Sequence, residues 1–387
     1  MLDVYVNVRF IGRNEIMGRT GAGMTILYDE GQQAIATESR RVLEARINKD
    51  ALLPLLETVG EYHRPFWDTA KEQGWTALAL PEAEGGLGLG LIELGLIAHQ
   101  AGRSISGAPF LTAGFGVAKA IELFGSDAQK ARWLPGLASG ETIGAIAFAA
   151  GPDALPARPD VTFTGDRLDG TVRSVSAGLV ADIAIVFANG PGMPVLALVE
   201  LAGAKRSAVP SFDNSRLIAD IGFSGVPAET LAVGSAARDA ALHILALQAV
   251  VTAHEQTGGA EALMEIARDY ALTRKAFGQP IGAFQSVKHR IAELYGLVEL
   301  ARANCIHAAA REGAADFITA AAAVRLSATE AYDTAARDCI QIHGGIGVTW
   351  EIGLHLHMRR ARSLAIEQGS SLFWEDVLVD QLAGEGA

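Results

Sequence analysis

The chain has 387 residues, of which half are apolar and a fifth are charged, and its formal net charge is −12. This length predicts two or three domains with a large buried core, and the composition excludes an intrinsically disordered protein. The negative charge argues against a nucleic-acid partner, because phosphate binding needs clustered Lys and Arg. No apolar run approaches the ~20 residues that span a bilayer, so we expect no membrane partner.

The only two cysteines, Cys305 and Cys339, lie in Ala-rich helical patterns. Two thiols are too few for a disulfide framework, and no CxxC pair indicates zinc, so we expect no metal site. Buried free thiols of this kind indicate a reducing compartment, and we predict a cytoplasmic protein.

The elements expected in chain order divide the sequence into four parts. Residues 1–23 lack the pattern of a signal peptide and match nothing that follows, so we treat them as an N-terminal extension. Apolar residues spaced three and four apart predict helices in residues 24–141, around a Gly-rich loop, PEAEGGLGLG, at 81–90. Short β-rich runs between turn residues (VTFTG, ADIAIVFA, MPVLALVEL, ETLAV) predict a small sheet or barrel in 142–234. Long Ala-rich amphipathic stretches predict a helical bundle in 235–387.

Two motifs in the last part carry residues suited to a nucleotide. In RKAFGQPIGAFQ, Arg274 offers a planar fork of donors for a pyrophosphate, and Phe277 and Phe284 offer flat surfaces for an adenine. In QIHGGIGVTWE, Gln341 offers a donor and an acceptor, and the glycines at 344, 345 and 347 let the backbone approach a ligand closely. Taken singly, each feature is ordinary in a helical protein. Taken together and in this order, they favour a cofactor site.

These motifs, with WTALALPEAEGGLGLG nearer the N-terminus, closely resemble the acyl-CoA dehydrogenase family in order and separation, over nearly the whole chain from about residue 25. The resemblance implies an α+β, mostly α fold: an N-terminal helical domain, a central small β-barrel or sheet domain and a C-terminal four-helix bundle. It also implies FAD, with Arg274, Phe277, Phe284, Gln341, Gly344 and Gly345 clasping the ADP portion of a cofactor bound mainly by the neighbouring subunit. The implied assembly is a homo- or hetero-oligomer, typically a tetramer built as a dimer of dimers. His343 is expected to pack or hydrogen-bond beside the cofactor without acid–base work.

The family chemistry is α,β-desaturation of an acyl-CoA thioester, of fatty-acid or steroid side-chain origin, with electrons passed to an electron-transfer flavoprotein. A carboxylate removes the α-proton while a hydride leaves for the flavin, and donors hold the enolate oxygen. Counted without gaps from Gln341, the family's catalytic Glu matches Gln368 in the stretch LAIEQGSS, and Glu367 precedes it. A Gln side chain has no basic site, although its backbone N–H can serve as an oxyanion donor. Some relatives carry the base on an earlier helix, which falls here near Gln248.

The flavin-ring side also departs from the family pattern. Residues 145–160, AIAFAAGPDALPARPD, lack the Thr and Glu of the usual ring-binding loop, and Val175 and Ser176 stand where the family places a Trp and a Ser or Thr. A shortened loop whose work is done by other groups is one explanation. Loss of the ring site is the other.

Three hypotheses follow for function. In the first, the chain is an active FAD-dependent acyl-CoA dehydrogenase in which Glu367 turns inward as the base and Ser370 bonds the flavin. In the second, it is a catalytically silent supporting subunit that lends its ADP-clasping residues to a catalytic partner in a heterotetramer, as in some steroid-degrading bacteria. In the third, the same fold serves a flavin oxidase, which also needs a base.

Overall fold

The computed structural model describes residues 28–106, 108–149 and 153–385. The predicted extension at 1–23 and residues 150–152 of the predicted ring-side loop lie outside the described residues. Within the described ranges the chain runs from helices to strands and back to helices. The predicted mostly helical α+β fold is confirmed, while the limits 24–141, 142–234 and 235–387 remain our proposal for its division into domains.

The N-terminal helices are α2 (Glu30–Arg46), α3 (Lys49–Glu57), α4 (Arg64–Glu72), α5 (Leu91–Arg103), α6 (Phe110–Phe124) and α7 (Asp127–Ser139), with 3-10 turns η1 (Trp75–Ala77) and η2 (Glu82–Glu84). Capping boxes begin α2 at Asp29 and α7 at Ser126, and each satisfies free N–H groups of the first turn. The Gly-rich loop folds back on η1: the Leu87 N–H donates to the Ala77 carbonyl at 2.9 Å. A Cβ at Gly86 would overlap the Leu80 carbonyl, so this glycine is required for the fold of the loop.

The strands form a closed barrel. They are β1 (Gly144–Ala147), β2 (Thr162–Thr164), β3 (Arg167–Val175), β4 (Ile183–Asn189), β5 (Pro194–Glu200), β6 (Lys205–Ala208) and β7 (Ala219–Val233). Pairing runs β4-β2-β3-β7-β5 and returns to β4; β1 adds parallel to β4, and β6 adds antiparallel to β7. A core of alternate apolar side chains fills the interior. Between β6 and β7, the turn η4 (Asn214–Arg216) contacts the helices, since the Asn214 side chain donates to the Leu56 carbonyl of α3 at 3.0 Å.

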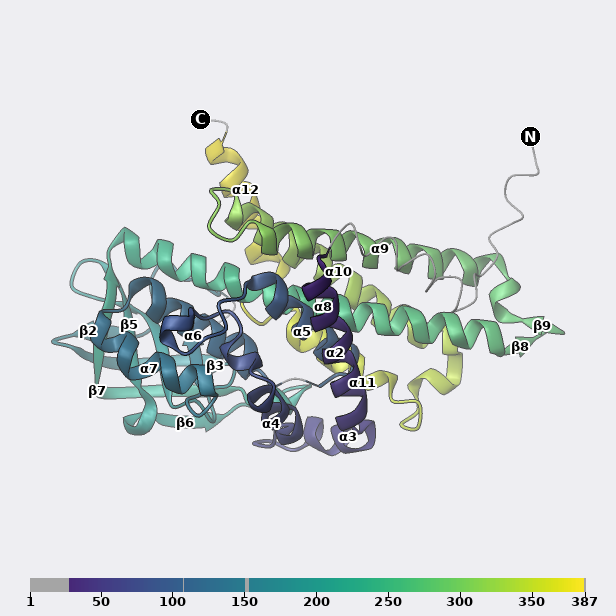
Figure 1. Cartoon of the computed structure of the whole chain (residues 1–387), viewed down its shortest axis with the longest axis horizontal. Helices are drawn as coiled ribbons and strands as arrows, with labels where there is room; N and C mark the ends of the chain where they lie inside the picture. The colour runs from purple at the N-terminus through teal and green to yellow at the C-terminus, as the bar shows by residue number, and fades with distance from the viewer. Residues whose placement is uncertain (1–27, 107, 150–152, 386–387) are drawn as a thin grey trace.

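The C-terminal helices are α8 (Ser235–Thr273), α9 (Gln285–Ala310), α10 (Phe317–His343), α11 (Leu354–Leu364) and α12 (Ser371–Glu385). Between α8 and α9 lie a small hairpin of β8 (Lys275–Ala276) and β9 (Gln279–Pro280) and the turn η5 (Ile281–Ala283). The turn η6 (Gly344–Val348) follows α10. Helix α8 runs along the molecule from the barrel to the hairpin, and α9 returns beside it (Figure 1). Helix α10 packs against α8, α9, α11 and α12. Among the described helices, none is long and apolar enough to cross a membrane.

Glycines bring α5 and α8 unusually close. A Cβ at Gly102 of α5 would overlap the backbone carbonyl of Glu255, and a Cβ at Gly258 of α8 would overlap that of His99. Close backbone approach of this kind needs residues without side chains at the crossing. The middle of α8 is therefore held at a fixed depth between the N-terminal helices and α10.

Candidate functional site

The stretch LAIEQGSS forms a fixed turn between α11 and α12. Gln368 has φ +55° and Gly369 has φ +105°, so the chain reverses through the left-handed region. The indole N–H of Trp374 donates to the Gln368 carbonyl at 3.1 Å. The Phe373 N–H lies 3.5 Å from the Ser370 hydroxyl oxygen, so that Ser370 caps the first turn of α12. This turn directs the side chains of Glu367 and Gln368 to different neighbours.

Glu367 is bound by Arg216. The guanidinium Nε and Nη2 donate to the two carboxylate oxygens, each at 2.8 Å, in a bidentate pair. The hydroxyl of Ser176 lies 3.3 Å from Oε2 of Glu367. Side-chain exposure is 5% for Glu367 and 1% for Arg216. Both oxygens of the acid beside the expected base position are therefore already engaged inside the protein.

A second arginine extends this pair into a network. Arg360 binds Asp213 at 2.5 Å and Glu255 at 2.8 Å, and its Nη1 donates to the Ser106 carbonyl at 2.8 Å. Arg216 approaches the same Glu255 oxygen at 3.6 Å. Burial opposes the charge on Asp213, but Arg360 and the Ser215 hydroxyl outweigh it and hold the pKa of Asp213 below its ordinary value.

Arg325 of α10 binds the backbone of the turn that carries Glu367. Its Nη2 donates to the Glu367 carbonyl at 2.7 Å and to the Leu364 carbonyl, and its Nη1 donates to Gln256. Burial lowers the pKa of Arg325 to about 10, which leaves it charged at neutral pH. We call Asp213, Arg216, Glu255, Arg325, Arg360 and Glu367 the buried charge cluster.

The two positions where the family carries its base hold amides. Gln368 accepts a hydrogen bond from the Thr252 hydroxyl at 2.9 Å, and Gln248 donates to the Thr112 carbonyl at 3.1 Å. Gln248 also closes the space beside α6, since a Cβ at Gly116 would lie 2.7 Å from its Nε2. These positions therefore face protein groups and carry no carboxylate.

Glu255 is the residue that sequence reasoning missed. It lies seven residues after Gln248 and three after Thr252, which places all three on one face of α8. The spacing of Glu255 from Gln248 and Thr252 on one helix face was the available signal. The partners of Glu255, Arg216 and Arg360, come from distant parts of the chain, and no local pattern pairs them.

The predicted ADP-clasping residues lie around the C-terminal end of α8. Arg274 is the C-cap of α8, and its exposed side chain makes no ion pair within the described residues. Phe277, at the tip of the β8–β9 hairpin, is 96% exposed and has φ +51°. Its ring stands edge-on to Phe284 with centroids 6.2 Å apart. This end of the bundle thus presents an exposed cation, Arg274, three residues before an exposed aromatic ring, Phe277.

The end of α10 meets the end of α8 at the same place. Tyr270 and His343 stack with ring centroids 4.0 Å apart, and the His343 Nδ1–H donates to the Cys339 carbonyl at 2.8 Å. Beyond this stack, Gln341 is exposed and Gly344 ends the helix with φ +63°. A Cβ on Gly344 or on Gly345 would meet no atom within 4 Å. The glycine backbone is therefore open to a ligand from outside.

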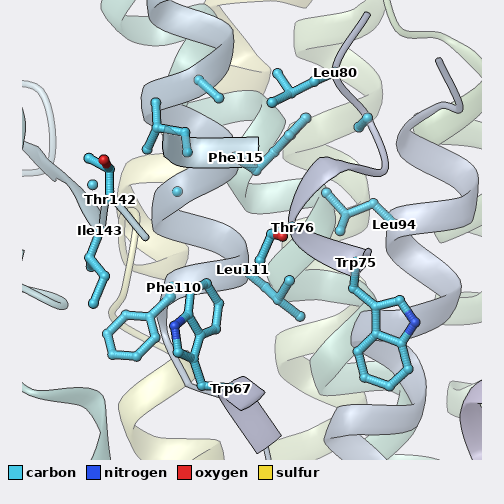
Figure 2. A pocket seen from close by; sticks show the side chains of 15 residues that line it. Trp67, Trp75, Thr76, Leu80, Leu94, Phe110, Leu111, Phe115, Thr142 and Ile143 are labelled. Carbon is cyan, nitrogen blue, oxygen red and sulfur yellow. The ribbon is translucent and has the colours of Figure 1, made fainter. Parts of the chain in front are cut away.

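Two hollows lie away from both groups of residues. The first, of about 20 Å³, is enclosed by aromatic and aliphatic side chains that include Trp67, Trp75 and Phe110 (Figure 2). It has room for about one water molecule, so we exclude it as a substrate site. The second is a cleft of about 360 Å³ between α2, α5 and α8. Its arginines, Arg40 and Arg103, are already paired with glutamates.

Comparisons with known proteins agree with the motifs. The family model for the acyl-CoA dehydrogenase N-terminal domain matches residues 29–141, and the model for the C-terminal domain matches residues 238–382. Acyl-CoA dehydrogenase IpdE2 of Mycobacterium tuberculosis is 32% identical over 305 residues, which cover 79% of this chain and 82% of that protein.

Two solved structures share the fold over 92% of this chain. A variant of the steroid ACAD Tcur3481–Tcur3483 has a TM-score of 0.81 at 27% identity, over 99% of its chain. The ChsE4–ChsE5 complex from Mycobacterium tuberculosis has a TM-score of 0.83 at 24% identity, over 98% of its chain. On the family models and the identity with IpdE2, this chain belongs to the acyl-CoA dehydrogenase family.

Proposed function

We propose that this chain is a supporting subunit of an acyl-CoA dehydrogenase: it lends an ADP-clasping surface to an FAD site in a related catalytic chain and does not itself desaturate the substrate. One observation carries the proposal. Glu367 is held bidentately by the buried Arg216, while an amide, Gln368, stands at the family's base position.

The base is the first part of the argument. Desaturation needs a carboxylate that can take the α-proton of the thioester. To do so, Glu367 would have to leave Arg216 and strand a buried guanidinium, at a cost of about 3–5 kcal/mol. Gln368 has no basic atom, and its side-chain oxygen is already bonded to Thr252. The backbone N–H of Gln368 remains our candidate for an oxyanion donor, a role that is idle without a base.

The cofactor is the second part. When bound, FAD supplies the hydride acceptor of this chemistry. The ADP side of the chain fits such a group, because Arg274, which has no ion-pair partner among the described residues, lies near the exposed Phe277 and the open backbone of Gly344 and Gly345. The ring side of the chain, at Val175 and Ser176, does not fit a flavin ring. The Ser176 hydroxyl faces Glu367, which belongs to the buried charge cluster. A surface that fits one half of a cofactor favours a shared site completed by a partner.

The related structures support a partner of the same fold. ChsE4–ChsE5 is a complex of two named chains, and Tcur3481–Tcur3483 is a two-component steroid ACAD. By analogy we propose a cytoplasmic heterotetramer that acts on an acyl-CoA, of steroid-derived or fatty-acid type, and passes electrons to an electron-transfer flavoprotein. Ser370 would then serve α12 and not a flavin.

Co-expression tests this function. We expect the chain purified alone to contain little flavin and to show no anaerobic flavin bleaching with a panel of fatty and steroid acyl-CoA thioesters. Co-expressed with the neighbouring gene for a related chain, it should yield a yellow complex that turns over. Full flavin occupancy and turnover in the lone chain would refute the proposal.

The second candidate is an autonomous dehydrogenase with Glu367 as its base. It is favoured by the presence of an acid on the inner side of the turn, beside Ser176. Under that function the lone chain bleaches with an acyl-CoA, and Glu367→Gln abolishes the bleaching. No contact at the site favours the flavin oxidase over either candidate.

A further inference from the structure

The buried charge cluster joins all three parts of the fold. Asp213 and Arg216 come from the turn η4 of the barrel region, and Glu367 from the turn after α11. The remaining members lie on three helices of the C-terminal part: Glu255 on α8, Arg325 on α10 and Arg360 on α11. The N-terminal helices take part through the Ser106 carbonyl, which accepts from Arg360 at 2.8 Å.

The cluster is balanced in charge. It contains three arginines and three carboxylates, and every member is buried. A buried ion persists only where partners replace its hydration, and removal of one partner leaves the other uncompensated. Burial opposes the charge on Arg216, but Glu367 and Glu255 outweigh burial and raise its pKa. The three positive charges of the set are therefore matched by three negative charges from the same chain.

Glu367 has the position of a ligand within this set. The turn that carries it passes through two residues with positive φ, and the carboxylate meets Arg216 with the two-point geometry that a free carboxylate would adopt. Ser176, from the loop where the family contacts its cofactor ring, adds a third contact at 3.3 Å. The acid thus connects the turn after α11 to two segments of the barrel region, the one that carries Arg216 and the one that carries Ser176.

We propose that Arg216 is a carboxylate-binding site and that Glu367 is its internal ligand, so that this chain joins its barrel region to its C-terminal helices at the ring side without a cofactor. The inference deepens the proposed function and rests on it for the meaning of the ring side. It explains how a subunit that does not fit a flavin ring still holds the rigid shape that presents Arg274 and Phe277 at the far end of α8.

The test is chemical rescue of the full-length chain. Glu367→Ala removes the atoms of one acetate ion from beside Arg216. We expect the Tm of this variant to fall by on the order of 5–10 °C. Sodium acetate should restore at least half of that loss at concentrations where acetamide, and sodium chloride of equal ionic strength, do not. Equal effects of acetate and chloride would overturn the proposal.

Glu57→Ala is the matched control. Glu57 makes an ion pair to the same C-terminal region, from α3 to Arg359 of α11 at 3.0 Å, but its side chain is 50% exposed. We expect a Tm change of less than about 2 °C and no specific response to acetate, because exposed ion pairs contribute little. A fall in Tm equal to that of Glu367→Ala would show that an exposed ion pair to the α11 region stabilises the fold as much as the Arg216–Glu367 pair does. That result would overturn a special role for Arg216.

If Glu367→Ala does not fold, Glu367→Gln keeps the shape of the side chain and removes its charge. We expect it to unfold at a lower temperature than the parent chain, and a Tm equal to the parent's would overturn the proposal. Added FAD should not raise the Tm of the lone parent chain; a rise of several degrees would also overturn it. Flavin capture by the co-expressed complex tests the proposed function separately, since it depends on Arg274 and not on acetate.

Discussion

Gly102 and Glu255 touch backbone to backbone where α5 crosses α8, so closely that a side chain on Gly102 would overlap the Glu255 carbonyl. The carboxylate of the same Glu255 forms an ion pair with Arg360. Helix packing and charge pairing are thus coupled at one residue. A change in the crossing moves the buried charge cluster as well.

Gly102→Ala should therefore destabilise the chain by several kcal/mol, about 3 or more, because neither backbone can yield without separating the helices. The measurement is urea unfolding followed by circular dichroism. Gly114→Ala on α6 is the control, since its Cβ would meet no atom within 4 Å. It should be neutral or stabilising by about 0.5–1 kcal/mol. Equal losses in the two variants would contradict the predicted clash.

Arg274→Gln should weaken FAD binding to the co-expressed complex by about 10- to 100-fold, because it removes a charged donor suited to a pyrophosphate. The folded stability of the chain should not change, since Arg274 is exposed. Flavin content per complex and FAD titration give the measurement. Lys275→Gln removes the neighbouring exposed cation and should have a smaller effect. A similar loss in both variants would indicate general electrostatics in place of a specific contact.

Gln368→Glu returns a carboxylate to the family's base position, but we expect no turnover from the lone chain. The new acid would face Thr252, while Glu367 and Arg216 still occupy the ring side. Anaerobic mixing with an acyl-CoA in the presence of added FAD, followed at the flavin absorbance, is the measurement. Bleaching restored by this single substitution would mean that the ring side accepts a flavin after all.

Stability should fall as the pH drops from 7 toward 5. Burial lowers the pKa of His254 to about 4, against an ordinary value near 6.5, so the unfolded chain binds a proton in this window that the folded chain does not. This difference lowers the free energy of unfolding by about 2 kcal/mol at pH 5 and has almost no effect above pH 7. Urea unfolding at pH 7.5 and 5.0 measures it. His254→Gln should reduce the difference between the two pH values, and an unchanged difference would contradict the assignment.

Asp213 affects stability in a lower pH range than His254. Since the pKa of Asp213 is held below its ordinary value, the stability that Asp213 contributes is present at neutral pH and is lost only as the pH falls below about 4. Losses between pH 7 and 5 therefore belong to buried histidines such as His254 and not to Asp213.

Native Cys305 and Cys339 should resist a thiol reagent at pH 8. Burial raises the pKa of each thiol to about 12, and both are inaccessible, as the sequence predicted. A chromogenic disulfide should titrate both thiols only after unfolding in guanidinium chloride. Rapid reaction of a native thiol would contradict this burial.

The fold was predictable because its signals are local. Helical spacing, turn residues and short apolar runs located the helices and the strands of the barrel, and the motifs around Arg274 and Gly344 identified the family. Closure of the barrel was left open between sheet and barrel, because it depends on the pairing of β4 with β5 and on the contact of Thr162 with Asn189 across the sequence. Residue spacing carries no information on such contacts.

The candidate site was predictable only in part for the same reason. Ungapped counting found Gln368 and Glu367, but not the partner of Glu367, since Arg216 lies 151 residues earlier in the chain. An arginine in a polar turn has no feature that marks it as buried. Its role arises only when the barrel, α8 and α11 meet.

Phe277 bears on how quickly the chain can associate. Its backbone already occupies the left-handed region, which is costly for a bulky residue, and its ring already stands in water. The conformational cost of presenting that ring is met during folding and not at the encounter. Binding at this hairpin should therefore be limited by diffusion and orientation and should leave the backbone of both strands unchanged.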